Sequence, residues 1–429
     1  MSQAAMGSGQ SLSQVVSNDA RLTRENITLT DQAPGRLVGI FLAIGAAGIL
    51  VTLIGAQVLD VKHALAAYHV AFMGVLSICL GSLFWVMLFH ILGATWSVTI
   101  RRQFENVMRA MWLCLILFLP IVILEVASQG ILFSWMDKAY TQGDPVYASK
   151  SGYLNVPFFL IRAAIYFGLW LLLVRKFWSW QQEQDSTADR WLTNKARYTS
   201  AWGLVIFGLT LTFSAFDWLM SLDYHFFSTM WGVYIFAGAA YSSMAVNILI
   251  MQWLRHTGRL EGVVTTEHRH DQAKLLFTFT VFWAYIGFSQ YFLIWYSNIP
   301  EETSYMLARK MFYPELTFVL VVGHFCLPFV LLLPRPAKRS SIWITIMAIG
   351  AVIIHFVDMY WIIQPMADIR EMGEGVDPIG LKGAWVVAAA VVGVFGLFGA
   401  VVIRNIYSTP LVPLNDPRLG ACLRHKNYV

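Results

Sequence analysis

The stretch ALAAYHVAFMGVLSICLGSLFWVMLFHIL, residues 64–92, contains no Asp, Glu, Lys or Arg. At 1.5 Å per residue, an α-helix of this length crosses the roughly 30 Å of hydrocarbon in a lipid bilayer. The stretch therefore predicts a membrane-spanning helix.

Comparable apolar stretches recur from Leu37 to Arg404, with polar breaks between them. Hydrophobic residues make up 57% of the 429 residues and charged residues only 13%, whereas soluble domains have about 25% charged residues. The composition predicts an all-α polytopic membrane protein with ten transmembrane helices. The predicted spans are residues 37–59, 64–92, 108–133, 154–178, 200–221, 228–253, 275–297, 315–333, 341–363 and 382–404.

The distribution of Lys and Arg predicts the orientation of the chain. With ten spans, both termini lie on one side of the membrane, and that side carries 22 Lys and Arg residues against 7 on the other. Because cytoplasmic loops are enriched in Lys and Arg, we expect both termini in the cytoplasm. The net charge of +5 is spread over many loops and does not suggest nucleic-acid binding.

Two tails flank the predicted transmembrane domain, residues 37–404. Residues 1–36 are polar and lack an apolar run before a cleavage site, so we expect no signal peptide. Residues 405–429 are broken by Pro410, Pro413 and Pro417. Neither tail can bury much apolar surface alone, so we expect docking on partners to order them, with disorder as the alternative.

The cysteines and histidines suggest no metal or haem site in this chain. Cys79, Cys114, Cys326 and Cys422 share no CxxC or CxxCH spacing, so an iron–sulfur cluster, a zinc site and c-type haem attachment are not expected. No helix carries two histidines at the spacing that two stacked haems would need. We expect no covalently bound cofactor in this chain, and expect any redox metal to lie in a partner.

A weak internal repeat relates the second to fifth spans to the sixth to ninth. Asp217 and Asp358 lie near the same end of the fifth and ninth spans, while Glu125 and Gln290 lie in comparable halves of the third and seventh. The repeat predicts two four-helix bundles, with the first and tenth spans flanking them.

Several ionisable residues fall at membrane depth. One charge at the bilayer centre costs roughly 2.5–3.5 kcal/mol even on a lenient scale, so the group needs a common explanation. Carboxyl groups in apolar surroundings, like histidines, can take up and release protons near neutral pH. The ionisable residues are Glu125, Arg162, Asp217, Glu315, His324, His355 and Asp358. The predicted proton path, a half-channel opening opposite the termini, comprises Glu125, Asp217, Gln290, His324, His355 and Asp358.

Two other interpretations of these residues stay open. They can pair across helices and hold the helices in register, with Arg162 as the charge partner of an acid and His355 paired with Asp358. They can also form a ligand site. The aromatic run 282–296 includes Trp283, Tyr285 and Tyr291, and such a wall can hold a quinone ring or seal a bundle. The sequence favours sealing.

Four stretches carry a resemblance to a known family. Residues 213–223, 279–291, 295–303 and 355–361 read FSAFDWLMSLD, FTVFWAYIGFSQY, WYSNIPEET and HFVDMYW. They resemble the F subunit (ActF) of bacterial alternative complex III, a quinol oxidoreductase, closely over the fifth to ninth spans and more loosely over the first four. Members of that family are similar to polysulfide-reductase-type (NrfD-like) membrane anchors.

The resemblance implies ten helices in two four-helix bundles, in a bacterial inner membrane. It implies a complex that oxidises menaquinol or ubiquinol and passes electrons to a cytochrome c or a haem-copper oxidase. The implied partners are a homologous NrfD-like subunit, an iron–sulfur subunit, multihaem cytochrome c subunits, small membrane subunits and lipids. The quinol site is then expected in the homologous subunit, and proton movement and scaffolding in this one. The matched motifs carry over Asp217, Gln290, His355 and Asp358.

We therefore expect a proton-handling subunit of a respiratory quinol oxidoreductase that has no redox centre of its own. An autonomous proton-coupled transporter is one alternative, and helices interrupted at matching midplane positions would favour it. Pro120 and Pro328 fall in spans that the repeat does not pair, which argues against it. A scaffold without proton transport is the other alternative.

Overall fold

A computed structural model describes residues 19–29, 34–372 and 379–427. Within them the protein is all-α, and ten helical segments are long and apolar enough to cross a membrane, which confirms the predicted number. The long elements are α3 (Gly35–Val58), α4 (Val61–Ile91), α5 (Val98–Met108) with α6 (Met111–Ala127), α8 (Val156–Thr187), α9 (Trp191–Trp218), α10 (Trp231–His256), α11 (Thr266–Ser297), α13 (Pro314–Leu320) with the π-helical turn η3 (Val321–Cys326) and α14 (Leu327–Leu332), α16 (Ser341–Met372) and α17 (Ala384–Tyr407). Short elements are α2 (Arg24–Ile27), η1 (Ser134–Met136), α7 (Pro145–Lys150), η2 (Met220–Leu222), α12 (Pro300–Phe312), α15 (Arg335–Arg339), η4 (Gly380–Gly383) and α18 (Leu419–Cys422).

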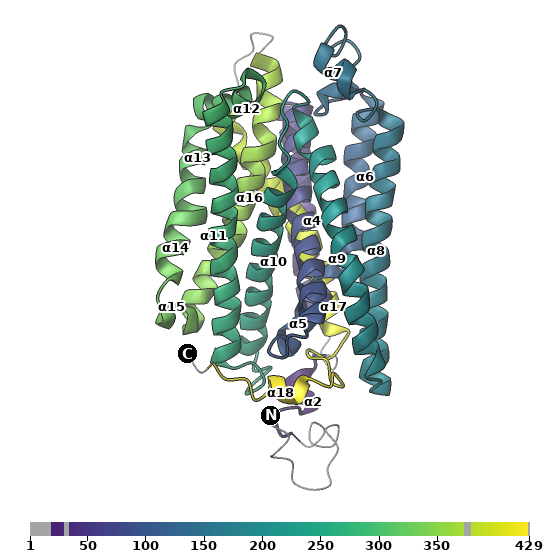
Figure 1. The fold of residues 1–429 in the computed structure, drawn as a ribbon, viewed down its shortest axis with the longest axis vertical. Coiled ribbons are helices and arrows are strands. Elements are labelled where there is room, and N and C mark those ends of the chain that lie inside the picture. The colour runs from purple at the N-terminus through teal and green to yellow at the C-terminus, as the bar shows by residue number, and fades with distance from the viewer. Residues whose placement is uncertain (1–18, 30–33, 373–378, 428–429) are drawn as a thin grey trace.

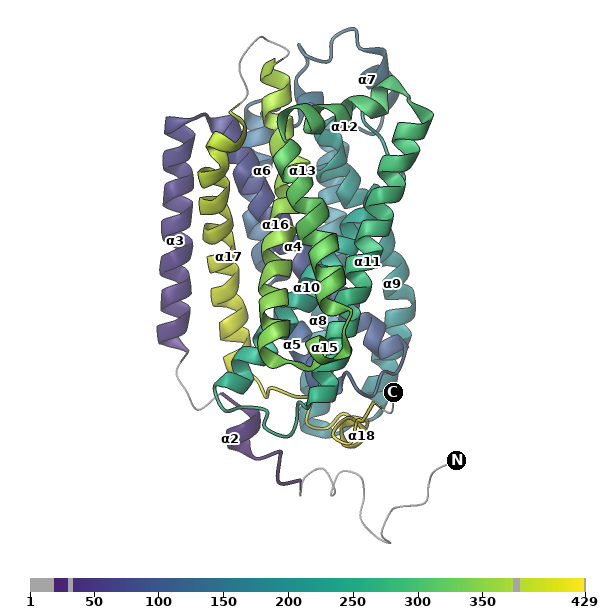
Figure 2. The ribbon, with the colours of Figure 1, turned by 90° about the vertical axis from the view of Figure 1, so that its left-hand side faces the viewer.

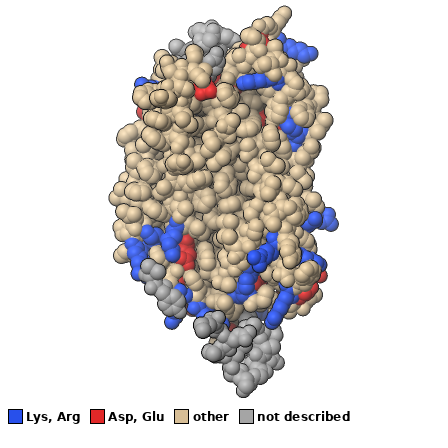
Figure 3. Space-filling model, in the orientation of Figure 1, with Lys and Arg blue, Asp and Glu red and all other residues tan. Residues whose placement is uncertain are grey.

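The long helices run side by side between two ends of the molecule (Figure 1 and Figure 2). The described parts of both tails lie at one end, where the backbone N–H of Leu411 donates to the carbonyl of Ile27 at 2.7 Å. We call this end the tail face, and the opposite end, with α7 and α12, the distal face. On the face shown in Figure 3, charged side chains gather at the two ends and leave a nearly uncharged band between them, as a membrane-spanning protein requires. Which compartment the tail face meets stays a prediction.

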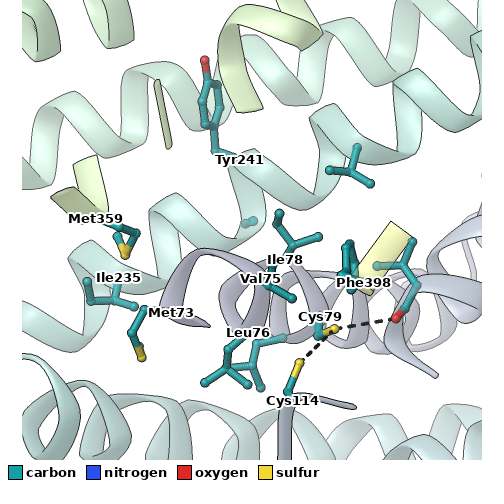
Figure 4. Packing of buried hydrophobic residues seen from close by; sticks show 14 of the residues in the cluster. Met73, Val75, Leu76, Ile78, Cys79, Cys114, Ile235, Tyr241, Met359 and Phe398 are labelled. Carbon is teal, nitrogen blue, oxygen red and sulfur yellow. Dashed lines mark hydrogen bonds between the residues drawn. The ribbon is translucent and has the colours of Figure 1, made fainter. Parts of the chain in front are cut away.

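Helix α4, the apolar stretch quoted above, lies at the centre of the molecule. It contacts α5, α6 and α9 and also α10, α16 and α17, so nearly all of its side chains are buried. Figure 4 shows Met73 and Leu76 of α4 among side chains from neighbouring helices, including Ile235 of α10 and Met359 of α16. A helix that is apolar on every face is expected to be surrounded by other helices. Helix α4 belongs to the first predicted bundle and α10 to the second, yet the two helices pack against each other. The arrangement in two four-helix bundles therefore stays a prediction.

Helices α4 and α10 cross at very short range because small residues face each other. A Cβ atom on Gly81 would lie 2.0 Å from the carbonyl oxygen of Ala239, so only glycine fits there. Next to this contact, the indole Nε1–H of Trp85 donates to the carbonyl of Ala240 at 3.0 Å. Small residues at such contacts let two helix backbones approach, which is the main source of packing energy between membrane helices. The two flanking helices, α3 and α17, approach each other closely in the same way, because Gly48 of α3 faces Gly393 of α17.

Several helices continue beyond the predicted spans at the tail face. Helix α5 begins at Val98, ten residues before the predicted span 108–133, and includes the buried side chains of Arg101 and Glu105. The polar sequence suggested a loop, but Arg101 forms ion pairs with Glu105 at 3.0 Å and with Asp416 of the C-terminal tail at 2.8 Å. These contacts compensate the charges, so the helix extends under the tail.

The C-terminal tail covers the tail face of the same chain. His425 contacts Asp271 of α11 at 2.6 Å, and the side chain of Asn415 donates to the carbonyl of Asp185 at 2.7 Å. The tail is therefore ordered by this chain's own helices. The prediction that residues 405–429 also dock on partner subunits remains a prediction.

The crossing at Gly81 makes a prediction about stability. Substitution Gly81→Ala places a methyl group against backbone atoms that cannot move aside, and overpacking of this kind costs about 1–3 kcal/mol. We expect a lower melting temperature of the purified protein in detergent. Gly168→Ala in α8 is the matched control, because nothing lies within 4 Å of the added Cβ there. Equal melting temperatures of the two variants would show that α4 and α10 do not depend on this contact.

Candidate functional site

The carboxyl group of Asp358 lies in the interior with two hydrogen-bond donors. Tyr234 of α10 donates its hydroxyl to Oδ1 at 2.5 Å, and Trp283 of α11 donates Nε1–H to Oδ2 at 3.0 Å. Asp358 is 1% exposed, and among the described residues no Lys, Arg or His lies within ion-pair distance of it. The structure therefore buries a carboxyl group that is solvated by neutral donors alone.

Two glycines leave room for this arrangement. A Cβ atom on Gly287 of α11 would lie 3.2 Å from Cε2 of Tyr234, so the tyrosine ring passes directly over this glycine. Gly238 of α10 faces both His355 and Asp358, at 3.5 Å and 4.0 Å from the same kind of Cβ atom. Helices α10 and α11 thus bring the tyrosine and the tryptophan onto one side of α16.

Two opposing effects act on the Asp358 carboxyl group. An uncompensated negative charge inside a membrane protein is costly, which favours the protonated form. The hydrogen bonds from Tyr234 and Trp283 favour the ionised form instead. A carboxyl group under this balance can take up or release a proton when its surroundings change slightly.

His324 lies next to this centre on the π-helical turn η3. Its ring stacks on the indole of Trp283, with ring centroids 3.7 Å apart, and is 4.6 Å from the ring of Tyr241. The residue is fully buried, and neither ring nitrogen has a hydrogen-bond partner among the described residues. The turn lies immediately before Pro328, which lacks an N–H for the regular helix ladder, and π-helical turns are frequent at functional sites.

His355 lies one turn before Asp358 and contacts α4. Its Nε2 is 2.6 Å from Oγ of Ser77, and that hydroxyl donates to the carbonyl of Gly74 at 2.8 Å. The hydroxyl has a single hydrogen, so we assign the proton of the ring to Nε2 and an open acceptor to Nδ1. Nδ1 is buried, with no hydrogen-bond partner in the described part of the chain. His355 thus forms its hydrogen bond with Ser77. The interpretation in which the ionisable residues pair across helices had expected Asp358 as its partner.

Gln290 lies between this centre and the distal face. It lines a small hollow of about 150 Å³ at that face, together with Ser228 and Glu302, and its Nε2 donates to Oγ of Ser228 at 2.8 Å. It also lines a larger cavity of about 660 Å³ that reaches Tyr234 and Trp283. The larger cavity lies between α10, α11, α13 and η3. Gln290 therefore separates a polar hollow at the distal face from the space beside Asp358.

The predicted residues Asp217 and Arg162 form a separate group between α8 and α9. Arg162 donates from Nε and Nη2 to the two carboxylate oxygens of Asp217, each at 2.8 Å. Tyr166 donates its hydroxyl to the same carboxylate at 2.8 Å, and the guanidinium lies over the ring of Tyr153. A bidentate, buried pair of this kind has both charges compensated. Arg162 is therefore the charge partner of an acid, as the pairing alternative supposed.

Glu125 and Glu315 lie in different surroundings from Asp358. The Glu125 carboxylate accepts the backbone N–H groups of Leu132 and Phe133, at 2.9 Å and 3.1 Å, and so closes the loop after α6. Glu315 is exposed in the first turn of α13, although its sequence position suggested membrane depth. An acid near a helix N-terminus interacts favourably with the helix dipole and needs no other explanation.

The aromatic wall divides into a buried and an exposed part. Trp283 is 7% exposed, whereas Tyr285 and Tyr291 are 64% and 49% exposed. All three line the larger cavity. Residues of the run 282–296 thus line a space between α11 and α13. The sealing role that the sequence favoured stays a prediction.

Two residues of this region were not predicted. In the sequence, Ser77 is one of several small residues in an apolar stretch. Only its contact with His355 in the structure marks it as part of this region. Arg309 of α12 looked like a loop residue, but it is 1% exposed and donates from Nε to the carbonyl of Trp361 at 2.9 Å. That carbonyl lacks its usual helix partner because position 365 is proline. The proline four residues beyond Trp361 was the signal that could have suggested a donor from elsewhere.

The loops at the distal face hold a polar cluster around Asp144. The carboxylate accepts from the hydroxyl of Tyr224 and contacts Nε2 of His225, each at 2.7 Å. Burial raises the pKa of Asp144, but these hydrogen bonds and those from two backbone N–H groups outweigh it and lower the pKa to about 2. Contact with Asp223 raises the pKa of His225, burial opposes this effect, and Asp144 adds to the rise. The loop before α8 is thus held on the loop after η2 by a charged pair.

Comparisons with known proteins add no family assignment. No family model matches the chain, and no curated protein matches it significantly. Among the described residues, no group of three His, Cys, Asp or Glu side chains is arranged to hold a metal ion.

The Arg162–Asp217 pair predicts a large effect on stability. Arg162→Met leaves the Asp217 carboxylate buried without its cation, and breaking a buried pair in this way costs about 3–5 kcal/mol. We expect a sharp loss of folded protein, measured by melting temperature and by yield in detergent. The double variant Arg162→Met with Asp217→Leu removes both charges and should recover most of the stability. Failure of the double variant to recover would mean that the pair is not the source of the loss.

The distal cluster predicts a pH dependence. The raised pKa of His225 means that its contact stabilises the loop fully below pH 6.5 and is lost as the pH rises through the raised value. The lowered pKa of Asp144 makes its contribution present above pH 3.8 and lost as the pH falls towards about 2. Hydrogen exchange of the backbone amides of residues 146–150 should therefore accelerate between pH 6 and pH 9, after correction for the intrinsic rate. His225→Asn should remove this dependence.

Proposed function

We propose that this chain is a proton-handling membrane subunit of a respiratory quinol oxidoreductase, with Asp358 as the residue that exchanges protons. The observation that carries this proposal is the buried carboxyl group of Asp358, which is held by Tyr234 and Trp283 without a cation. Asp217, by contrast, has its charge compensated by Arg162. A proton on Asp217 would break its ion pair with Arg162, whereas a proton on Asp358 breaks no ion pair.

The path to Asp358 begins at the distal face. Glu302 and Ser228 line the hollow there, and Gln290 stands between this hollow and the cavity that reaches Tyr234. The Tyr234 hydroxyl donates to Asp358 and can itself accept a hydrogen bond from the cavity side, so it can pass a proton by exchanging one bond for another.

Two histidines lie on the inner side of Asp358. His324 stacks on Trp283, and His355 lies one helical turn away on α16. Each ring has a buried nitrogen without a hydrogen-bond partner among the described residues, and such a nitrogen of a neutral imidazole can accept a proton. We therefore place them after Asp358 in the direction of the membrane centre. Glu125 and Asp217 are left out of this path, because loop backbone and Arg162 occupy their carboxylates.

The family resemblance supports the assignment to a quinol oxidoreductase. The stretches that carry it include Gln290, His355 and Asp358, which are residues of the proposed path. In this proposal electrons pass through iron–sulfur and multihaem cytochrome c subunits of an alternative complex III, while this chain and a homologous NrfD-like subunit lie in a bacterial inner membrane. Haem and iron–sulfur clusters belong to those partners.

One observation favours an autonomous proton-coupled transporter instead. The eighth span is not a continuous α-helix, since η3 interrupts it between α13 and α14 beside the cavity. Discontinuous helices near the membrane midplane are typical of transporter binding sites. Purification in mild detergent separates the two functions: a subunit of the complex carries haem- and iron–sulfur-bearing partners with it, whereas a transporter is isolated alone.

The proposal predicts the effect of Asp358→Asn. Asparagine has nearly the same shape but cannot ionise, so proton movement coupled to turnover should fall about tenfold or more, as on removal of a proton-transfer group. The measurement is acidification or alkalinisation inside proteoliposomes that contain the purified assembly, followed with a pH-sensitive dye. Assembly itself should persist, because the asparagine amide still places an oxygen and an NH2 group beside Tyr234 and Trp283.

Two further variants serve as controls for this measurement. Glu315→Gln removes an exposed carboxylate from α13, at the edge of the same region, and should leave proton movement unchanged. Asp217→Asn should lower the amount of assembled protein, because it weakens the pair with Arg162, but not the proton movement per assembled protein. Undiminished proton movement in Asp358→Asn would refute the proposed role of Asp358.

A further inference from the structure

The cavity beside Asp358 has the size and position of a ligand site. Its volume is about 660 Å³, within the range of roughly 300–1,000 Å³ that small-molecule sites occupy. It extends between α11 on one side and α13 with η3 on the other, and Tyr234 and Trp283 are among its buried lining residues. These two residues are the hydrogen-bond donors to Asp358. A ligand in this cavity would therefore lie against the proposed proton-exchange centre.

The cavity opens towards the apolar band of the surface. Of the side chains that line it, Tyr285, Phe288 and Val321 are 64%, 67% and 53% exposed, and all three lie in the central part of transmembrane segments. Such side chains face lipid in a membrane protein. A ligand that enters by this route must be soluble in the hydrocarbon of the bilayer.

The inner walls of the cavity are flat and aromatic. The indole of Trp283 is held in place from behind by the stacked ring of His324, and Trp231 and Phe325 also line the space. Rigid aromatic rings favour a planar ring as a partner, by offset stacking. A flexible acyl chain gains no comparable advantage from them.

A few polar groups lie among these aromatic walls. Tyr234, Gln290 and Thr317 line the cavity. The Thr317 hydroxyl accepts the indole N–H of Trp361 at 2.9 Å and donates to the carbonyl of Tyr313 at 3.3 Å. Small-molecule sites typically combine an apolar lining with a small number of such groups, which fix the orientation of the ligand. They suit a planar ring that bears oxygen atoms at its edge.

We propose that this cavity binds the ring of a membrane-soluble quinone or hydroquinone, with one oxygen atom towards the second amide hydrogen of Gln290 and, in the hydroquinone, one hydroxyl donating to the oxygen of Tyr234. The inference rests on the proposed function, because it supplies the proton-exchange centre at Asp358 with a protonatable partner. It concerns binding alone and requires no electron transfer within this chain. The family resemblance implies a quinol site in the homologous subunit, so the site proposed here is a second one.

The test fills the cavity from its rim without touching Asp358. Val321→Phe adds a ring at a lining position of η3, whereas Val319→Phe adds the same ring two residues earlier on α13, where the side chain is 43% exposed and outside the lining. The probe is decylubiquinone, titrated into the purified protein in phosphatidylcholine nanodiscs. Binding is followed by quenching of tryptophan fluorescence, since Trp231, Trp283 and Trp361 line the cavity.

We expect saturable quenching in the unmodified protein and in Val319→Phe, and an affinity about tenfold lower in Val321→Phe at an unchanged melting temperature. Oleate, which offers an acyl chain without a ring, should not displace the probe. Equal affinity in the two variants would overturn the proposal, and so would displacement by oleate at the concentration of the probe, which would assign the cavity to lipid chains.

The same variants separate this proposal from the proposed function. If Asp358→Asn keeps its proton movement while Val321→Phe loses the probe, the quinone site stands and the proton-exchange role fails. If Asp358→Asn loses proton movement while Val321→Phe binds the probe as tightly as the control, the proton-exchange role stands and the quinone site fails.

Discussion

The structure depends on the close crossing of α4 and α10 at Gly81. Lipid tails are as apolar as leucine, so the hydrophobic effect does not draw membrane helices together, and shape-complementary contact must do so instead. The missing side chain at Gly81 lets the backbone of Ala239 approach, and the Trp85 indole then reaches the carbonyl of Ala240. With this contact made, α4 is enclosed on all sides, and α16 is brought against it where His355 meets Ser77.

The same enclosure gives the two buried aspartates different chemistry. Asp217 faces α8, which supplies Arg162, so its charge is compensated and its contribution is to hold two helices together. Asp358 faces α10 and α11, which supply a hydroxyl and an indole N–H but no cation. One carboxyl group thus has a cation beside it, while the other is held by a hydroxyl and an indole N–H. The proposed function rests on this difference, because it assigns Asp217 to packing and Asp358 to proton exchange.

Much of this site could be predicted from the sequence, but not its internal division. The depth of Asp217, His324, His355 and Asp358 in apolar stretches is visible in the sequence, and all four are buried. Their partners are not visible, because helices that lie far apart in the chain supply them. The buried side chain of Arg309 was missed for the same reason: its acceptor is a carbonyl in another helix.

The sequence by itself determined the all-α class, the ten spans and the burial of Asp217, His324, His355 and Asp358 within them. It could do so because the thickness of the hydrocarbon and the cost of burying a charge act on each stretch separately. Only the tertiary structure decided which acid has a cation, where the eighth span is interrupted and that a cavity lies beside Asp358. Those features depend on which faces of the helices meet. Small residues such as Gly81 and Gly287 determine these faces, because they allow a neighbouring helix to approach closely.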